Sequence, residues 1–281
     1  MSTSARRLWS AAEVLHAVTY FHPTALAAVS EAGAVGFWMG YFAARLGPLG
    51  PVGPAVGTAV CFNFSPARVA RALPDAWSYL APSAAVQART TGAAAALTAC
   101  GVPDPAPELL DAFDRLVDGL DPAGRPLAAA NLDLPSPADP LPRLWQLCTI
   151  LREHRGDAHV ALLVGAGLDG CEANVLATAV AGIDPAILRD TRAWSMDHWR
   201  NASGRLMGEG ILAGDGSVTR EGAELHADIE HRTDALALES YRATLDGSEL
   251  GRLTDGLRAL ARPVVAAGVV PFPNPIGVAD P

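Results

Sequence analysis

Residues 194–234 read WSMDHWRNASGRLMGEGILAGDGSVTREGAELHADIEHRTD. Ser195 is a typical N-cap residue, and the segment after it predicts a helix over 195–209 that ends at Gly210. Ile211-Leu212, the Gly-Asp-Gly turn and Ser217-Val218 then predict a two-stranded hairpin. Thr219 caps a long amphipathic helix that continues to about residue 238. Together with a helix and a glycine turn before them, these elements have the layout of a winged helix-turn-helix unit.

The helix over 195–209 is the one that would enter the major groove if this unit binds DNA. His198, Arg200 and Arg205 are then the candidate DNA contacts, and the hairpin is a candidate minor-groove wing. The net charge of this segment argues against DNA binding. Residues 189–222 contain five arginines and five acidic residues, whereas phosphate binding depends on positive charge. DNA is therefore a candidate partner, and a purely scaffolding role for the fold is the alternative.

Composition limits the classes of protein to which the chain can belong. Half of its 281 residues are hydrophobic and 18% are charged, which is enough for a large, mainly helical core. All 21 basic residues are arginine, so chemistry that needs a lysine, such as a pyridoxal-phosphate Schiff base, is excluded. We expect no cofactor. The net charge of −9 argues against a protein that coats DNA non-specifically.

The cysteine, histidine and proline positions bear on location and metal binding. The four cysteines form no CxxC pair and no secretory signal is visible, so we expect free thiols in a reducing cytoplasm. Residues 46–67 carry no charge but contain four prolines, which argues against a membrane span. The histidine pairs 154/159 and 16/22 lack the i, i+4 spacing that places two imidazoles on one helix face, so we expect no metal site.

A Pro-rich segment divides the chain. We predict an N-terminal helical, winged-helix-like domain over 1–101, a connector over 102–143, a C-terminal winged helix-turn-helix domain over 144–262 and an extended tail over 263–281. A short strand is predicted over 59–64. Residues 31–43 (EAGAVGFWMGYFA) and 165–177 (GAGLDGCEANVLA) align without gaps, which favours two copies of one helical unit. The predicted fold class is thus mainly α, with two winged-helix-like units and a small β-hairpin wing in the second.

Several stretches spread over the chain carry a resemblance to a known family. They are HAVTYF (16–21), GYFAARLGPLGPVG (40–53), FNFSPARVARALPDAW (62–77), GRPLAAAN (124–131), LREHRGDAHVALL (151–163) and the segment 194–234. With these the chain resembles an actinobacterial tandem helix-turn-helix family of unsettled function, and RLMGEGIL (205–212) resembles the end of MarR-type repressors. The resemblance implies a fold and a domain order, not a mechanism.

LREHRGDAHVALL gathers charge directly before an apolar run, and two geometries fit it. In one, the helix breaks at Gly156, Asp157 is the N-cap of the next helix, and the cluster is structural. In the other, the helix continues, and Arg152, Arg155 and His159 lie on its apolar face. Buried cations on that face would need partners, and Glu153 and Asp157 are the nearest candidates.

A second polar set lies in the N-terminal half, where His16, Tyr41 and Arg45 are the candidate site residues beside Tyr20 and His22. Tyr41 and Arg45 share a helix face at i, i+4. The alternative is that His16 is an ordinary core histidine and Arg45 a helix cap. The set of candidate ligand-binding residues is completed by Arg152, Arg155, Asp157 and His159.

Three functions fit these observations. The first is a MarR-like regulator, a monomer or homodimer, in which a small-molecule ligand between the two halves biases DNA binding. The second is an enzyme or small-molecule-binding protein on a winged-helix scaffold that does not bind DNA, in which His159 is the acid or base and the arginines hold a carboxylate. The third is an interaction module with no pocket.

Overall fold

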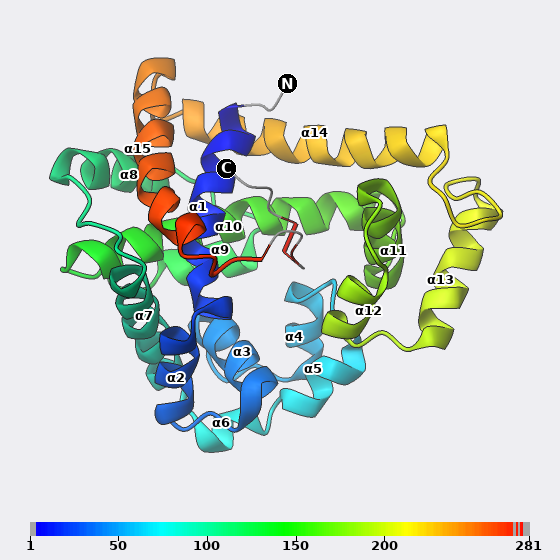
Figure 1. Ribbon diagram of the computed structural model, residues 1–281, viewed down its shortest axis with the longest axis horizontal. Coiled ribbons are helices and arrows are strands. Elements are labelled where there is room, and N and C mark those ends of the chain that lie inside the picture. Colours follow the sequence, from blue (N-terminus) through cyan, green and yellow to red (C-terminus); the bar gives the residue numbers. More distant parts are fainter. Residues whose placement is uncertain (1–3, 272–273, 275, 278–281) are drawn as a thin grey trace.

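The computed structural model describes residues 4–271, 274 and 276–277, and this part of the chain is mainly helical (Figure 1). In chain order the helices are α1 (Ser4–Phe21), α2 (Pro23–Glu31), α3 (Gly36–Leu46), the 3-10 helix η1 (Gly47–Leu49), α4 (Pro54–Val60), α5 (Pro66–Ala72), α6 (Ala76–Tyr79), α7 (Pro82–Ala99), α8 (Pro107–Asp118), α9 (Pro126–Leu132), α10 (Pro140–Gly165), α11 (Gly170–Ala181), α12 (Ala186–Arg192), α13 (Met196–Gly208), α14 (Arg220–Arg242) and α15 (Gly247–Ala266).

Helix α1 lies at the centre of the largest core. Its apolar residues are buried on nearly all sides, as expected for a helix that has no wide polar face. It packs against α15, α10 and α7, so segments from both ends of the chain meet here. The sequence did not predict α15, which continues through Pro263, so the first four residues of the predicted extended tail are helical. Residues 272–273, 275 and 278–281 of that tail lie outside the described residues.

The segment predicted as a connector contributes to this core. Phe113 and Leu116 of α8 are fully buried in it, and Leu127 of α9 is buried against the helices around α3. Proline begins both helices, at the position where its missing N–H is tolerated. The division of the chain into two units remains a prediction, but the proline-rich middle contributes two packed helices, whereas residues 121–124 and 138–140 are exposed.

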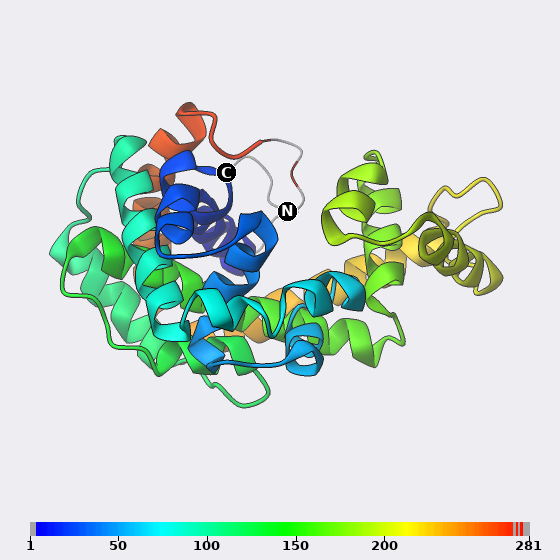
Figure 2. The same ribbon diagram turned by 90° about the horizontal axis from the view of Figure 1, so that it is seen from below.

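Helices α11 to α14 form the predicted helix-turn-helix arrangement at one end of the molecule (Figures 1 and 2). Ser195 and Thr219 cap α13 and α14 through their side-chain oxygens, as expected from the sequence. The predicted β-hairpin wing is wrong: the arms meet only in one isolated bridge, between Leu212 and Val218. Each arm has only two residues, and Thr219 caps α14 immediately after the bridge, so the pairing stops at two backbone hydrogen bonds, from Ala213 N–H to the Ser217 carbonyl and from Thr219 N–H to the Ile211 carbonyl.

The prediction of a strand over 59–64 is also wrong. Helix α4 extends to Val60, and the chain then turns through Cys61. The Asn63 carbonyl accepts hydrogen bonds from Asn174 Nδ2 at 2.8 Å and from Trp194 Nε1 at 3.0 Å. This turn therefore links α4 and α5 to the helix-turn-helix end of the molecule instead of pairing as a strand.

Helix α10 is continuous through Gly156, so the alternative with a helix break at that residue is wrong. Asp157 does not cap its own helix; its carboxylate accepts from the backbone N–H groups of Leu127 and Ala128, at 2.9 and 3.0 Å. These N–H groups lie in the first turn of α9, where the helix itself has no acceptor for them. The charged stretch thus turns inward and fixes a second helix against α10.

The sequence repeat has a counterpart in the helix boundaries. Three pairs of equivalent positions are each separated by 134 residues: the ends of α2 and α10 at Glu31 and Gly165, the positive-φ glycines Gly33 and Gly167, and the starts of α3 and α11 at Gly36 and Gly170. The turn between the two helices thus has the same length at both places, with a positive-φ glycine at the same position.

Candidate functional site

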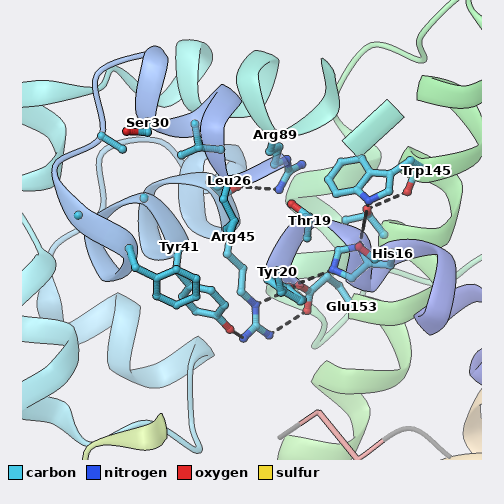
Figure 3. Close-up of a pocket in the computed structure, with 17 residues that line it drawn as sticks. His16, Thr19, Tyr20, Leu26, Ser30, Tyr41, Arg45, Arg89, Trp145 and Glu153 are labelled. Carbon is cyan, nitrogen blue, oxygen red and sulfur yellow. Dashed lines mark hydrogen bonds and ion pairs between the residues drawn. The ribbon is translucent and has the colours of Figure 1, made fainter. Parts of the chain in front are cut away.

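An N-terminal cavity of about 300 Å³ lies between α1, α2, α3, α7 and α10 (Figure 3). Leu26, Val29 and Phe37 provide part of its apolar wall, and three predicted site residues, His16, Tyr41 and Arg45, lie on its polar side. Its polar lining residues include His16, Tyr20, Tyr41, Arg45, Arg89 and Glu153. A mainly apolar cavity with a few converging polar groups is the usual form of a small-molecule site.

His16 belongs to a chain of hydrogen bonds along one wall of the N-terminal cavity. Its Nδ1 lies 3.0 Å from Thr149 Oγ1, and the Thr149 hydroxyl donates to the Trp145 carbonyl at 2.9 Å. The Thr149 oxygen therefore accepts, which assigns the imidazole proton to Nδ1. Nε2 then accepts from the Tyr20 hydroxyl at 3.0 Å.

Burial keeps both ends of that chain neutral. It lowers the pKa of His16 well below its usual value, and the positive charge of Arg152 acts in the same direction. Burial likewise raises the pKa of Tyr20. His16 also stacks on Trp145, with ring centroids 5.3 Å apart. His16 is thus a neutral imidazole that presents a hydrogen-bonded wall to the cavity.

Arg45 on α3 forms an ion pair at the N-terminal cavity. Its Nε and Nη2 donate to the two oxygens of Glu153, both at 3.1 Å, and its Nη1 donates to the Tyr41 hydroxyl at 3.2 Å. Arg152 donates to the same Glu153 carboxylate at 2.7 Å and to Glu13 at 3.3 Å. Two arginines and two glutamates thus alternate in a buried network.

The network fixes the charge state of Glu153. Burial alone would raise its pKa, but the charges of Arg152 and Arg45 outweigh burial and lower the pKa to about 2. Glu13 has the opposite balance: burial raises its pKa although Arg152 lies beside it. Arg45 and Arg152 are therefore both used to neutralise carboxylates of the chain itself.

Arg89 on α7 is a site residue that the sequence did not indicate. It is 4% exposed and donates to the Ala44 carbonyl at 2.9 Å and to Asn131 Oδ1 at 2.6 Å. Its Nε has no hydrogen-bond partner among the described residues. A signal was present, because Arg89 lies on the same alanine-rich stripe of its helix as Ala85 and Ala93, which are buried.

The predicted ligand-binding residues do not form one site. His16 and Tyr41 line the N-terminal cavity, while a second, central cavity of about 380 Å³ is lined by Arg152, Arg155, Asp157 and His159. Arg45 borders both cavities. The ion pair between Arg45 and Glu153 therefore lies at the partition between the two spaces.

Arg155 and His159 in the central cavity are tied to α14. Arg155 Nη2 lies 2.9 Å from Glu230 and 3.0 Å from Asp234, and its guanidinium packs over the Trp9 ring at 4.4 Å. His159 Nδ1 lies 3.1 Å from Thr233 Oγ1. Sequence reasoning missed the partners on α14, which are about 75 residues away along the chain.

Burial lowers the pKa of His159 to about 4; Glu230 acts against this and the charge of Arg155 acts with it. The imidazole is therefore neutral at pH 7. Burial raises the pKa of Asp157 to about 6, and its two backbone hydrogen bonds oppose that rise. Asp157 thus bonds to the start of α9, whereas His159, the predicted acid or base, bonds to Thr233 of α14.

The candidate DNA contacts lie on α13. His198 and Arg200 are exposed; the His198 ring bonds to Ser195 Oγ, and Arg200 pairs with Asp197 at 2.5 Å. Arg205 donates to Glu172 and Asp169, both at 2.6 Å, at the start of α11. Each of these side chains already has an intramolecular partner, and both arginines are paired with acids.

The described residues contain no group of three or more His, Cys, Asp and Glu side chains placed to hold a metal ion. Within that part of the chain, no single helix has the length and apolarity to cross a membrane; only α10 and α11 together, bent by 101° at their junction, reach both.

Comparison with known proteins gives one match. No curated protein and no solved structure shows significant similarity to the chain. A family model described as a helix-turn-helix family matches residues 5–271, which include every helix described above. The chain therefore belongs to this helix-turn-helix family.

Proposed function

We propose that the protein is a cytoplasmic, MarR-like transcriptional regulator that responds to a small molecule bound in the N-terminal cavity. The observation that carries this proposal is the double role of α10. Its residues Trp145, Thr149 and Glu153 line the cavity, and the same helix ends at Gly165, a short turn before α11 of the helix-turn-helix unit. A ligand that moves α10 moves that unit with it.

The rigidity of α10 supports such coupling. Arg155 and Asp157 join it to α14 and to α9 through buried hydrogen bonds. A ligand shifts an equilibrium only by its different affinity for the two states. A cavity wall formed by a helix that also carries the DNA-binding unit provides such a difference.

DNA is the partner that the family membership supports, with α13 as the helix that enters the major groove. On this proposal His198, Arg200 and Arg205 make the contacts, after Arg200 and Arg205 exchange their acidic partners for phosphates. Two helix-turn-helix units in one chain would take the place of the two subunits of a dimeric repressor.

A second candidate is a small-molecule-binding protein on the same scaffold that does not bind DNA. The observation in its favour is that Arg200 is paired with Asp197, and Arg205 with Asp169 and Glu172. The face of α13 is thereby close to neutral, whereas non-specific DNA affinity depends on positive charge.

The test is fluorescence anisotropy with DNA from upstream of the protein's own gene, at several salt concentrations. The regulator predicts specific binding that weakens with salt, and a loss of at least tenfold in affinity for Arg200→Ala. Arg115→Ala, which removes an exposed arginine of α8, is the matched control. Absence of binding to all DNA, together with thermal stabilisation by small molecules, would favour the second candidate.

A further inference from the structure

Arg89 is the cation that sets the N-terminal cavity apart from an ordinary buried gap. Three charged residues line the cavity: Arg45, Arg89 and Glu153. Glu153 is already bound by Arg45 through both of its oxygens and by Arg152. No ion pair with Arg89 occurs among the described residues; its two hydrogen bonds go to neutral oxygens, of Ala44 and Asn131.

A buried cation without a counter-charge is costly in free energy. Burial lowers the pKa of Arg89 to about 10, although the negative charge of Glu153 acts against this. The ring of Trp145, 5.5 Å from the guanidinium carbon, gives only a weak cation–π contact. The positive charge of Arg89 at the cavity therefore has no negative partner among the described residues.

The donors of Arg89 are suited to a carboxylate. A guanidinium carries five N–H groups, and Arg89 uses one on each of its two terminal nitrogens, so that each of these nitrogens keeps a second N–H; Nε is buried and has no partner among the described residues. Carboxylates match this planar set of donors with paired hydrogen bonds. A phosphate dianion would bring more charge than one unpaired arginine neutralises, into a lining that is mainly apolar.

The size of the cavity limits the rest of the ligand. An apolar cavity of roughly 150 Å³ holds benzene, and this one is about 300 Å³. It therefore accepts one ring or a short alkyl chain in addition to the charged group. Leu26, Val29 and Phe37 provide apolar surface for that part.

We infer that the N-terminal cavity binds a small monocarboxylic acid, with the carboxylate on Arg89 and the apolar body against Leu26, Val29 and Phe37. The inference names the ligand class of the proposed function and rests on it for its biological meaning. It makes Arg89 a specificity residue, because a neutral molecule of the same shape leaves the guanidinium without a counter-charge.

Calorimetric titration of the full-length protein tests the inference with pairs of probes that differ only in charge. Phenylacetate is compared with phenylacetamide, and octanoate with octanamide. In at least one pair, we expect the acid to bind ten times more tightly than its amide. Equal affinities within both pairs, or no binding of either acid at millimolar concentration, would overturn the inference.

Two variants test whether Arg89 is the residue that distinguishes the acid from its amide. Arg89→Met is expected to lose the preference for the acid, and Arg71→Met, which removes an exposed arginine of α5, is expected to keep it. If Arg89→Met does not fold, the comparison within the wild-type protein still decides. If the acid binds but has no effect on DNA binding, the regulator is ruled out and this inference stands. If the protein binds DNA but not the acid, this inference is ruled out and the regulator stands.

Discussion

Arg45 and Glu153 are 108 residues apart in the chain, yet the guanidinium of the first holds both oxygens of the second at 3.1 Å. The pair joins α3 to the middle of α10 at the partition between the two cavities. It is largely buried, so its members depend on each other: without Arg45, Glu153 keeps one cation, Arg152, and without Glu153, Arg45 keeps the neutral Tyr41 hydroxyl.

Glu153→Gln is therefore expected to lower the free energy of unfolding by about 3–5 kcal/mol, because it leaves Arg45 and Arg152 with one counter-charge fewer in a buried site. Urea titration at pH 7 measures the change. Glu224→Gln is the control, since that residue forms an exposed pair with Arg220 and should cost less than about 0.5 kcal/mol. Similar small losses in both variants would contradict the interdependence of the buried charges.

Asp157 gives a second prediction, because it caps a helix other than its own. Asp157→Ala removes the acceptor for the N–H groups of Leu127 and Ala128 and should cost about 2 kcal/mol. Asp157→Asn retains a carbonyl oxygen at the same place and should cost less than about 1 kcal/mol. Hydrogen exchange should show the loss at the start of α9; a loss confined to α10 would count against the cap.

Gly170 gives a third prediction, at the contact between the two halves. A Cβ built there would lie 2.0 Å from the Phe62 carbonyl oxygen, so the backbones would have to separate. We expect Gly170→Ala to destabilise the protein by more than about 2 kcal/mol. Gly204→Ala is the matched control, because its Cβ meets nothing within 4 Å, and it should stabilise α13 by up to about 1 kcal/mol. Equal effects would mean that the turn at Phe62 is not held against α11.

Much of the helical framework follows from local signals in the sequence. Caps such as Ser195 and Thr219 act within one helical turn, so the sequence predicts α13 and α14 to within a few residues. Helix α15 has an equally clear start, the capping box of Asp246 and Glu249, but no helix was predicted there, and the prolines from Pro263 onward predicted an extended tail where its last turn lies. The prediction of the wing was wrong for a local reason as well, because its arms are too short to pair beyond a single bridge.

The site was harder to predict because its contacts are not local. The sequence indicated that His16, Tyr41 and Arg45 are polar residues on apolar helices, but not that Arg45 meets Glu153 or that Arg155 meets Asp234. Such pairs depend on how the helices cross. The separation into two cavities likewise follows from the continuity of α10. The spacing of its apolar residues alone did not decide whether the helix continues through Gly156.

His154 gives a prediction about pH. It is fully buried, and neither ring nitrogen has a hydrogen-bond partner at normal geometry among the described residues. Burial, together with the charge of Arg125, lowers its pKa to about 4 from the usual 6.5. The unfolded chain therefore binds a proton between pH 6.5 and pH 4 that the folded protein does not, so the folded state loses stability as the pH falls through this range.

His154→Leu removes this one contribution. At pH 7 we expect little change or a gain in stability, because two unsatisfied polar atoms are replaced by apolar ones. Between pH 7 and pH 4 the variant should gain roughly 3 kcal/mol relative to wild type. Urea unfolding over this range measures the difference, from which the other titrating groups, shared by both proteins, cancel. A difference that stays constant with pH would contradict the prediction, because it would show that His154 takes up its proton at the same pH in the folded protein as in the unfolded chain.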